Sequence, residues 1–414
     1  MRIDANIAER AVTGRAVVIG CALSFALLSF LPLPEAQAQI RCTNATVGNN
    51  LVPDWGPAAV CAGASAGASI TSAITTLDIA FLTQSTTFVS FPSNPRPDQL
   101  GGGIWIRGVG GENTVSSSSA TTSVGTGGSI PPGTVAISSQ ERMEYGGFQA
   151  GADLGKFNLG ASNLNVVFGI TGGLLDARAT DQIGVGNTQF SVPFFGGYVA
   201  VTKDRFFADA EVRGDFYNMT ANNSNVALSN TGFDGRGVTV TGSAGYSIPV
   251  GTFFIEPSAG IIWSRLSIDN LSTPGGGPVQ IPPGAYSFGN PESLIGRLGL
   301  RLGTSFQSPG ITWQPFVSAS VWDEFAGSNT TTFACTGCTF SLSTDTSRIG
   351  VFGQLGIGTA AEIVNTGVLG YLRADYRAGD NIRGWDITGG IRYQFPVGTS
   401  SPTPPITKAP PPRS

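Results

Sequence analysis

The sequence contains no histidine, and charged residues make up 12% of it, against about 25% in an average soluble protein. Histidine is the commonest general base and metal ligand, so its absence removes the usual centre of hydrolytic and metal-dependent chemistry. A formal charge of −4 offers no basic surface to nucleic acid. We therefore expect no catalytic, cofactor-binding or metal-binding residues, although a carboxylate pair or a Ser–Lys pair stays open as a hydrolytic alternative.

Long apolar runs are also missing, except near the N-terminus. Three arginines precede the largely apolar run 16–33, and Ala36-Gln37-Ala38 follows it. This order predicts a secretory signal peptide, residues 1–38, cleaved after Ala38, with an uncleaved anchor as the alternative. No later segment has the roughly 20 consecutive apolar residues of a transmembrane helix, so a mature protein that crosses a membrane must do so as a barrel.

Cysteine is scarce, with five in the chain. Cys42 and Cys61 fall in a short segment, 39–64, and in an exported protein this pair predicts a structural disulfide. Cys335 and Cys338 form a C-x-x-C motif, which elsewhere indicates redox or zinc chemistry. Since no second pair and no histidine accompany it, we expect a local disulfide in an external loop.

Residues 65–88 have apolar side chains near helical spacing and one charged residue, Asp78. A helix of this length would be about 36 Å long, enough to span a bilayer. Its many serines and threonines make it too polar to face lipid. It is either a surface helix or a helix inside a pore, and prolines end it within the segment 65–98. The apolar positions of the predicted pore helix are Ile70, Ile74, Leu77 and Phe81.

From residue 99 to 395, segments with alternating apolar and polar residues recur. We count twelve, near residues 103–110, 142–154, 158–174, 189–202, 205–217, 236–249, 252–266, 293–306, 311–323, 347–360, 366–377 and 384–395. Alternation places one kind of side chain on each face of a strand. Long connections such as 111–141 alternate with tight turns such as 308–310, which is typical of outer-membrane barrels. The predicted fold is an all-β, twelve-stranded antiparallel transmembrane barrel with an N-terminal helix in its pore.

The charged face of these strands must line the interior, because one arginine facing mid-bilayer would cost roughly 2–4 kcal/mol. These charges either pair with one another and contact the helix, or form an ion-selective lining. The predicted pore-lining residues are Arg107, Asp209, Glu211, Arg213, Asp215, Glu256, Arg297, Arg301, Arg373, Asp375, Arg377 and Arg392. Five tryptophans and Tyr393 are interpreted as aromatics at the membrane interface, some of them as packing residues (Trp105, Trp263, Trp313, Trp322 and Trp385).

The order of these features resembles the translocator domain of the autotransporter family. The matching features are a helix before the barrel, a first strand Gly103-Ile104-Trp105-Ile106-Arg107-Gly108 and a last strand Gly390-Ile391-Arg392-Tyr393-Gln394-Phe395. The resemblance implies insertion into outer-membrane lipid with help from periplasmic chaperones and the barrel-assembly machinery, which reads a terminal aromatic like Phe395. The chain departs from the family pattern in its short segment 39–64, a vestigial passenger, and in its Pro-rich tail 396–414. We expect this tail to be disordered in the periplasm, where it could contact the cell wall.

The sequence thus predicts a translocator barrel with a very short passenger and a pore plugged by its helix. Two alternatives remain: a porin-like channel, and a surface interaction protein acting through loops 111–141 and 267–292.

Overall fold

The computed structural model describes residues 55–82, 95–123, 133–338 and 341–396. These residues form one α-helix and eighteen strands: α1 (Trp55–Leu82), β1 (Gln99–Ser123), β2 (Gly133–Phe157), β3 (Leu164–Asp181), β4 (Asn187–Lys203), β5 (Phe206–Asn223), β6 (Leu228–Tyr246), β7 (Ile248–Val250), β8 (Phe253–Ile268), β9 (Leu271–Thr273), β10 (Gly284–Ser287), β11 (Glu292–Thr304), β12 (Phe306–Ser308), β13 (Ile311–Glu324), β14 (Asn329–Cys335), β15 (Ser341–Thr346), β16 (Phe352–Ile363), β17 (Val368–Gly379) and β18 (Ile382–Pro396). The strands dominate the described part of the chain, and α1 precedes all of them.

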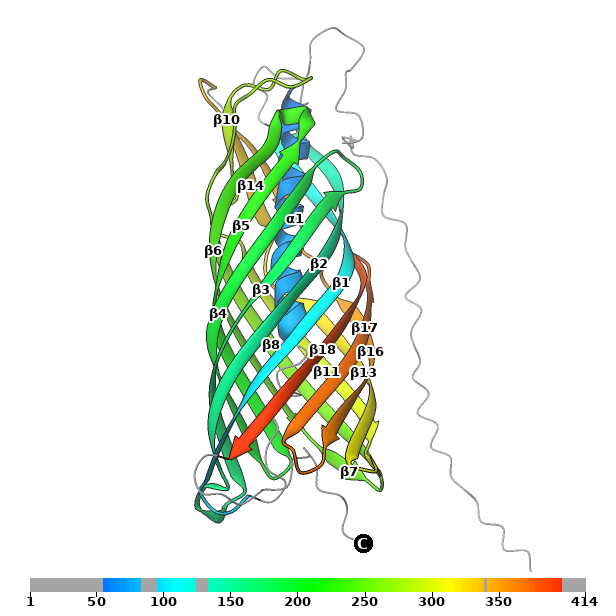
Figure 1. The fold of residues 1–414 in the computed structure, drawn as a ribbon. Helices are drawn as coiled ribbons and strands as arrows, with labels where there is room; N and C mark the ends of the chain where they lie inside the picture. The colour runs from blue at the N-terminus through cyan, green and yellow to red at the C-terminus, as the bar shows by residue number, and fades with distance from the viewer. Residues whose placement is uncertain (1–54, 83–94, 124–132, 339–340, 397–414) are drawn as a thin grey trace, which may run out of the picture. The chain divides into compact units, whose positions relative to one another are not determined.

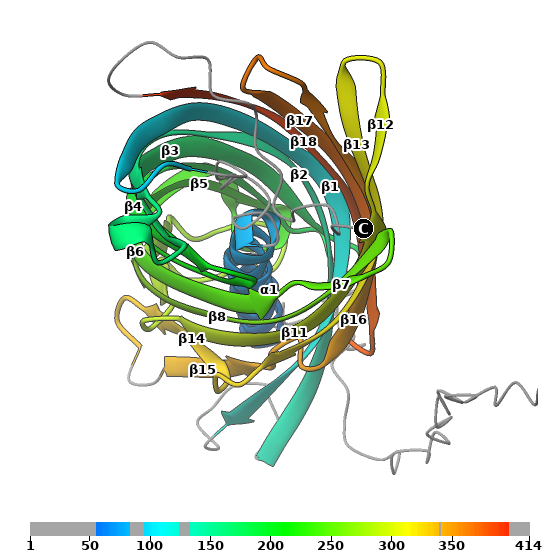
Figure 2. The same cartoon turned by 90° about the horizontal axis from the view of Figure 1, so that it is seen from below.

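Twelve strands form a closed antiparallel ring, each paired with the next, in the order β1, β2, β3, β4, β5, β6, β8, β11, β13, β16, β17 and β18. The ring closes between β1 and β18, where Gly101 pairs with Pro396 and Val115 with Ile382. Seen along its axis, the ring surrounds α1 (Figures 1 and 2). The predicted twelve-stranded barrel with a preceding helix is confirmed.

Side-chain alternation separates the two faces of the wall. On β3, for example, Phe168 and Ile170 point outward and are 65% and 72% exposed, whereas Val167 and Thr171 point inward and are buried. Similar exposed apolar side chains occur on the other strands of the ring. Exposed apolar area of this extent is unusual for a soluble protein and suits contact with lipid.

The two ends of the ring differ. At one end the strands join through short turns, and Gly251 and Gly310 occupy two of these turns with φ of 61° and 76°, a region that glycine enters at little cost. Asp98 lies at the same end, where the ammonium group of Lys156, 2.9 Å away, lowers the pKa of its carboxyl by hydrogen bonding. Long connections lie at the other end, as the sequence predicted.

The long-loop end is more regular than expected. The connection 111–141 is largely strand, because β1 and β2 are each 25 residues long and extend into it. The connection 267–292 contains the short strands β9 and β10. β14 and β15 follow β13 and join this extension, since β15 pairs with β1 and β14 pairs with β10. The sequence pattern missed these strands because their outward positions carry polar or small residues, mostly serine and threonine, so the alternation of large apolar and polar residues is absent.

The helix also differs from the prediction. It begins at Trp55, ten residues before the expected start at residue 65, and so includes the last ten residues of the segment 39–64. The sequence W-G-P-A-A-V-C-A-G-A is rich in alanine, the strongest helix former, and Pro57 lies in the first turn, where proline is tolerated. Residues 83–94 lie outside the described residues, as does Cys42, so the Cys42–Cys61 disulfide stays a prediction.

Two tryptophans interpreted as interface residues face the interior instead. Trp105 is 9% exposed and Trp322 is fully buried. The indole of Trp105 donates a hydrogen bond to the Tyr198 hydroxyl at 2.8 Å, and Trp322 stacks on Phe352. The position of a tryptophan in the alternating pattern of its strand decides whether its side chain points outward or inward, and both of these tryptophans are at inward positions.

Candidate functional site: a helix held inside the barrel

The helix α1 fills the lumen towards the long-loop end of the barrel. By length and composition, residues 56–81 could cross a membrane, yet almost all of this stretch is buried inside the protein. The four predicted helix residues Ile70, Ile74, Leu77 and Phe81 are all at most 2% exposed. Polar helix residues such as Ser69, Ser72 and Thr76 are equally buried, and they are tolerated because the facing wall is polar as well.

The helix approaches the wall closely at Gly67. A Cβ atom added there would lie 2.6 Å from Oγ1 of Thr331 on β14 and 3.1 Å from Oγ1 of Thr346 on β15. Nearby, the Asn329 amide donates a hydrogen bond to the Thr71 hydroxyl at 2.8 Å. The extra strands at the long-loop end therefore form the wall of the helix pocket.

The central contact between helix and wall is an ionic cluster, the Asp78 anchor. A guanidinium nitrogen of Arg213 lies 3.2 Å from the Asp78 carboxylate, and the Ser264 hydroxyl donates to the same carboxylate at 2.8 Å. Arg213 also binds Asp215 at 2.7 Å, and Thr239 donates to Asp215 at 2.6 Å. Asp78, Arg213 and Asp215 are each at most 2% exposed. Because all three charges are buried, each depends on its oppositely charged partner for stabilisation.

The last turn of the helix is held by Arg107. Its guanidinium donates a hydrogen bond to the carbonyl oxygen of Phe81 at 2.7 Å and another to Gln149 at 2.8 Å. The last carbonyls of a helix have no partner within the helix and carry partial negative charge. A cation from β1 therefore caps the inner end of α1.

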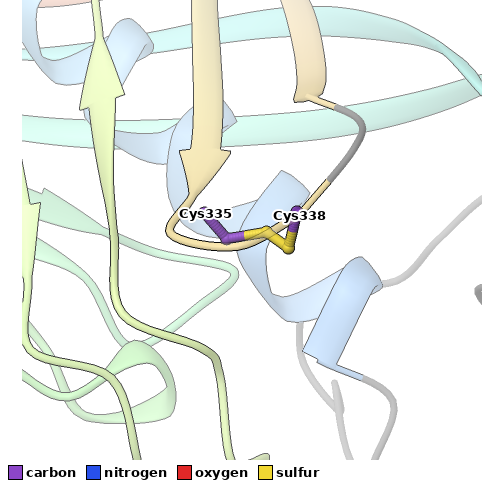
Figure 3. The surroundings of a disulfide bond; sticks show 2 residues. All are labelled: Cys335 and Cys338. Atoms are coloured by element: carbon purple, nitrogen blue, oxygen red, sulfur yellow. A yellow bond between two sulfur atoms is a disulfide. The ribbon is translucent and has the colours of Figure 1, made fainter.

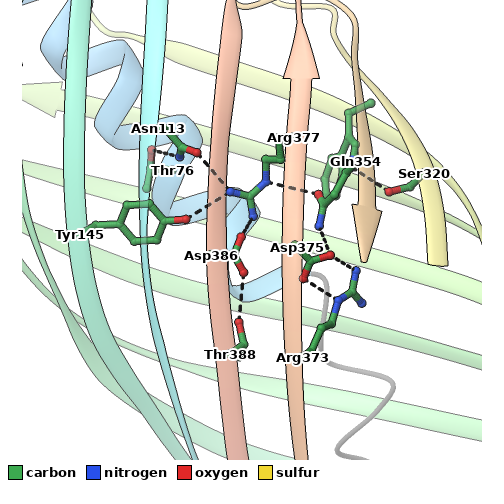
Figure 4. Close-up of polar contacts among 11 residues, drawn as sticks. Thr76, Asn113, Tyr145, Ser320, Gln354, Arg373, Asp375, Arg377, Asp386 and Thr388 are labelled. Carbon is green, nitrogen blue, oxygen red and sulfur yellow. Dashed lines mark hydrogen bonds and ion pairs between the residues drawn. The ribbon is translucent and has the colours of Figure 1, made fainter. Parts of the chain in front are cut away.

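A second ionic cluster, centred on Arg377, links the helix to the closing strands (Figure 4). Arg377 forms an ion pair with Asp386 and donates to Asn113 at 3.3 Å and to the Tyr145 hydroxyl at 3.2 Å. The Asn113 amide in turn donates to the Thr76 hydroxyl at 3.2 Å. This cluster joins β17, β18, β1, β2 and α1, so it stabilises the seam at which the ring closes.

The twelve charged residues predicted to line the pore all occupy inward positions. Ten are buried and two, Arg297 and Arg301, are half-buried, the full set being Arg107, Asp209, Glu211, Arg213, Asp215, Glu256, Arg297, Arg301, Arg373, Asp375, Arg377 and Arg392. Most contact an opposite charge, as Arg301 does with Glu256 at 3.1 Å. Arg297 lies over the ring of Trp322 at 5.5 Å instead.

Several contact residues were not identified from the sequence. Asp153 on β2 binds Arg392 through two hydrogen bonds of 2.6 and 2.7 Å, and Gln149 lies at an inward position of the same strand. The alternation along β2 could have identified both. Asn113 could not be found in this way, because its segment was interpreted as a loop.

Cys335 and Cys338 are bonded to each other where β14 ends (Figure 3). Their Cα atoms are 5.4 Å apart. Within the described part of the chain, no group of three His, Cys, Asp or Glu residues is arranged to hold a metal ion.

Phe395 lies near the end of β18, opposite Gly102 of β1. Its ring lies 6.2 Å from that of Tyr393. The predicted barrel-terminal aromatic is thus part of the closing seam, and residues 397–414 of the tail lie outside the described residues.

Residues 104–375 match the family model of the autotransporter β-domain. Solved structures give the same fold. The transport unit of the autotransporter AIDA-I from Escherichia coli is 14% identical, with a TM-score of 0.57 over 84% of this chain and 100% of that one. The translocator domain of NalP from Neisseria meningitidis is 14% identical, with a TM-score of 0.51 over 80% of this chain and 99% of that one.

The β domain of the Bordetella autotransporter BrkA is 21% identical, with a TM-score of 0.50 over 70% of this chain and 98% of that one. No curated protein sequence matches the chain.

Proposed function

Because this chain belongs to the autotransporter family through its β-domain, we propose that it is an outer-membrane translocator whose lumen is closed by its own N-terminal helix. The observation that carries this proposal is the Asp78 anchor. Removing a carboxylate and a guanidinium from water is costly unless they remain paired. Arg213 and Ser264 are arranged to satisfy a carboxylate from the helix, so the resting state is the plugged one.

The direction of the helix supports export of the preceding residues. Its first half packs beside β14 and β15 at the long-loop end, and Phe81 lies deeper, at Arg107 (Figure 1). The chain then enters β1 from the short-turn end. With the long loops facing outward, as in other outer-membrane barrels, the residues before α1 emerge on the cell surface after removal of the signal peptide 1–38.

Assembly follows from the same proposal. The terminal aromatic Phe395 is the residue we expect the barrel-assembly machinery to read, after periplasmic chaperones have carried the unfolded chain. The Pro-rich tail beyond β18 then lies in the periplasm, where it is free to contact the cell wall. In this account the barrel acts on no substrate and has no enzymatic role.

Planar-bilayer conductance of the purified protein tests the proposal. The full chain is expected to show little conductance, because α1 occupies the lumen, and removal of residues 55–82 should open a stable ion-conducting pore. The same barrel carrying an exposed substitution, Arg383→Ala on β18, serves as the control and should stay closed.

Equal conductance with and without the helix would contradict the plug. A full-length protein that already conducts strongly would instead favour the porin-like alternative.

A further inference from the structure

A groove of about 850 Å³ lies on the outer face of the wall, away from the lumen. Six neighbouring strands, β1 to β6, contribute to it. Strand register aligns its outward side chains in two rows: Gly146, Asp176, Ser191, Asn218 and Asp234 in the first, and Glu144, Arg178, Gln189, Thr220 and Gly232 in the second. All of these side chains are exposed or half-exposed, so the groove is open to the outside.

The groove directly borders the apolar surface. The next row towards the short-turn end contains Phe148, Leu174, Pro193 and Phe216, and ends in Arg236. Phe216 stacks on exposed Phe195, with ring centroids 5.7 Å apart. Aromatic side chains collect at the level where lipid tails meet head groups. The groove therefore begins where the membrane's hydrocarbon ends, at the long-loop end of the barrel.

The chemistry of the lining selects the ligand. Ser191 at the middle of the first row and glycine at one end of each row leave space, and carboxylates, carboxamides and one guanidinium border that space. Three carboxylates against one arginine would repel a bare anion. Arg142 is already bound by Glu112 at 2.8 Å and Glu144 at 3.1 Å, and Arg236 adds one cation at the edge towards the apolar row. Such a mixture suits vicinal hydroxyl groups, which both donate and accept hydrogen bonds.

We propose that this groove binds the saccharide head group of a glycolipid in the outer leaflet through the hydroxyl groups of the sugar, with its acyl chains on the apolar row below. The inference rests on the proposed function only for the orientation of the barrel, with its long loops facing outward. Such a site would hold one glycolipid molecule at a fixed position beside β2–β6, whereas the rest of the barrel surface would contact lipid without selecting it.

Lipid retention by the full-length protein tests the inference. The protein is purified from outer membranes in mild detergent, and bound lipopolysaccharide and phosphatidylethanolamine are counted per barrel by native mass spectrometry. Ser191→Trp fills the centre of the groove and should reduce retained lipopolysaccharide at least about tenfold, as expected for the loss of two or three ordinary hydrogen bonds. The matched control, Ala378→Trp on the outer face of β17, should retain it like the wild type.

Heat-modified gel migration reports whether each variant is folded. If Ser191→Trp does not fold, Asn218→Ala provides a smaller change in the same row and should lower the amount of retained lipopolysaccharide. Equal lipopolysaccharide retention in groove and control variants would overturn the inference. So would a parallel loss of phosphatidylethanolamine, because this would indicate a general effect on bound lipid. Neither result depends on the plug, which the conductance measurement tests separately.

Discussion

Replacing Arg213 with alanine is expected to release α1 from the lumen, because it leaves Asp78 and Asp215 buried without their shared cation. Both carboxylates are 1% exposed, and among the residues that the structure describes, the hydroxyls of Ser264 and Thr239 are the hydrogen-bond partners that remain after the substitution. Removing one member of a buried ion pair typically costs about 3–5 kcal/mol. We expect a loss of this size in the free energy that holds the helix, measured as an opened pore in planar bilayers.

Asp78→Asn is the matched control for this prediction. It leaves Arg213 paired with Asp215 as a neutral unit, and the asparagine oxygen still accepts the Ser264 hydrogen bond. Its cost should be about 1 kcal/mol, the usual contribution of one hydrogen bond. An Arg213→Ala barrel that stays as closed as Asp78→Asn would mean that the anchor does not hold the plug.

Arg377→Ala is expected to weaken the barrel itself. The substitution leaves Asp386, 3% exposed, without its cation and removes the donor shared by Asn113 and Tyr145. The buried carboxylate should lower the free energy of unfolding by about 3–5 kcal/mol. Urea unfolding in lipid vesicles, followed by tryptophan fluorescence, measures this change.

Exposed Arg383 on β18 provides the comparison, since Arg383→Ala removes the same side chain from the neighbouring strand without uncovering a buried charge. Its unfolding midpoint should match the wild type. A similar midpoint for Arg377→Ala would contradict a stabilising role for the cluster at the closing seam.

The ring of strands could be predicted because the lipid imposes a strict pattern. Outward positions at membrane depth face lipid and are therefore apolar. On β5, for example, the outward residues Phe206, Ala208 and Ala210 alternate with inward residues that are mostly charged. Beyond the lipid this constraint ends, and the outer parts of β1 and β2 carry mostly polar side chains, such as Ser118 and Gln140, on their outward faces. There the strands are stabilised by pairing and by contact with α1, which no local pattern reveals.

The candidate site was predictable in part for the same reason. Alternation assigns Arg213 and Arg377 to the inside of the barrel, but not to particular partners, since these come from distant strands. Ser264 lies 186 residues from Asp78 in the sequence. Asp78 itself carried a usable signal: a single carboxylate on a helix destined for a polar lumen requires a cation nearby.

The position of α1 can be tested most directly by cross-linking in intact outer membranes. Thr71 on the helix and Asn329 on β14 are joined by a 2.8 Å hydrogen bond. With cysteines at these two positions and the native cysteines replaced, a disulfide should form under mild oxidation and shift the protein on a gel. A pair at Thr71 and the outward residue Ser343 should not cross-link. Failure of the first pair in a correctly folded barrel, or equal cross-linking of both, would contradict a helix held inside the lumen.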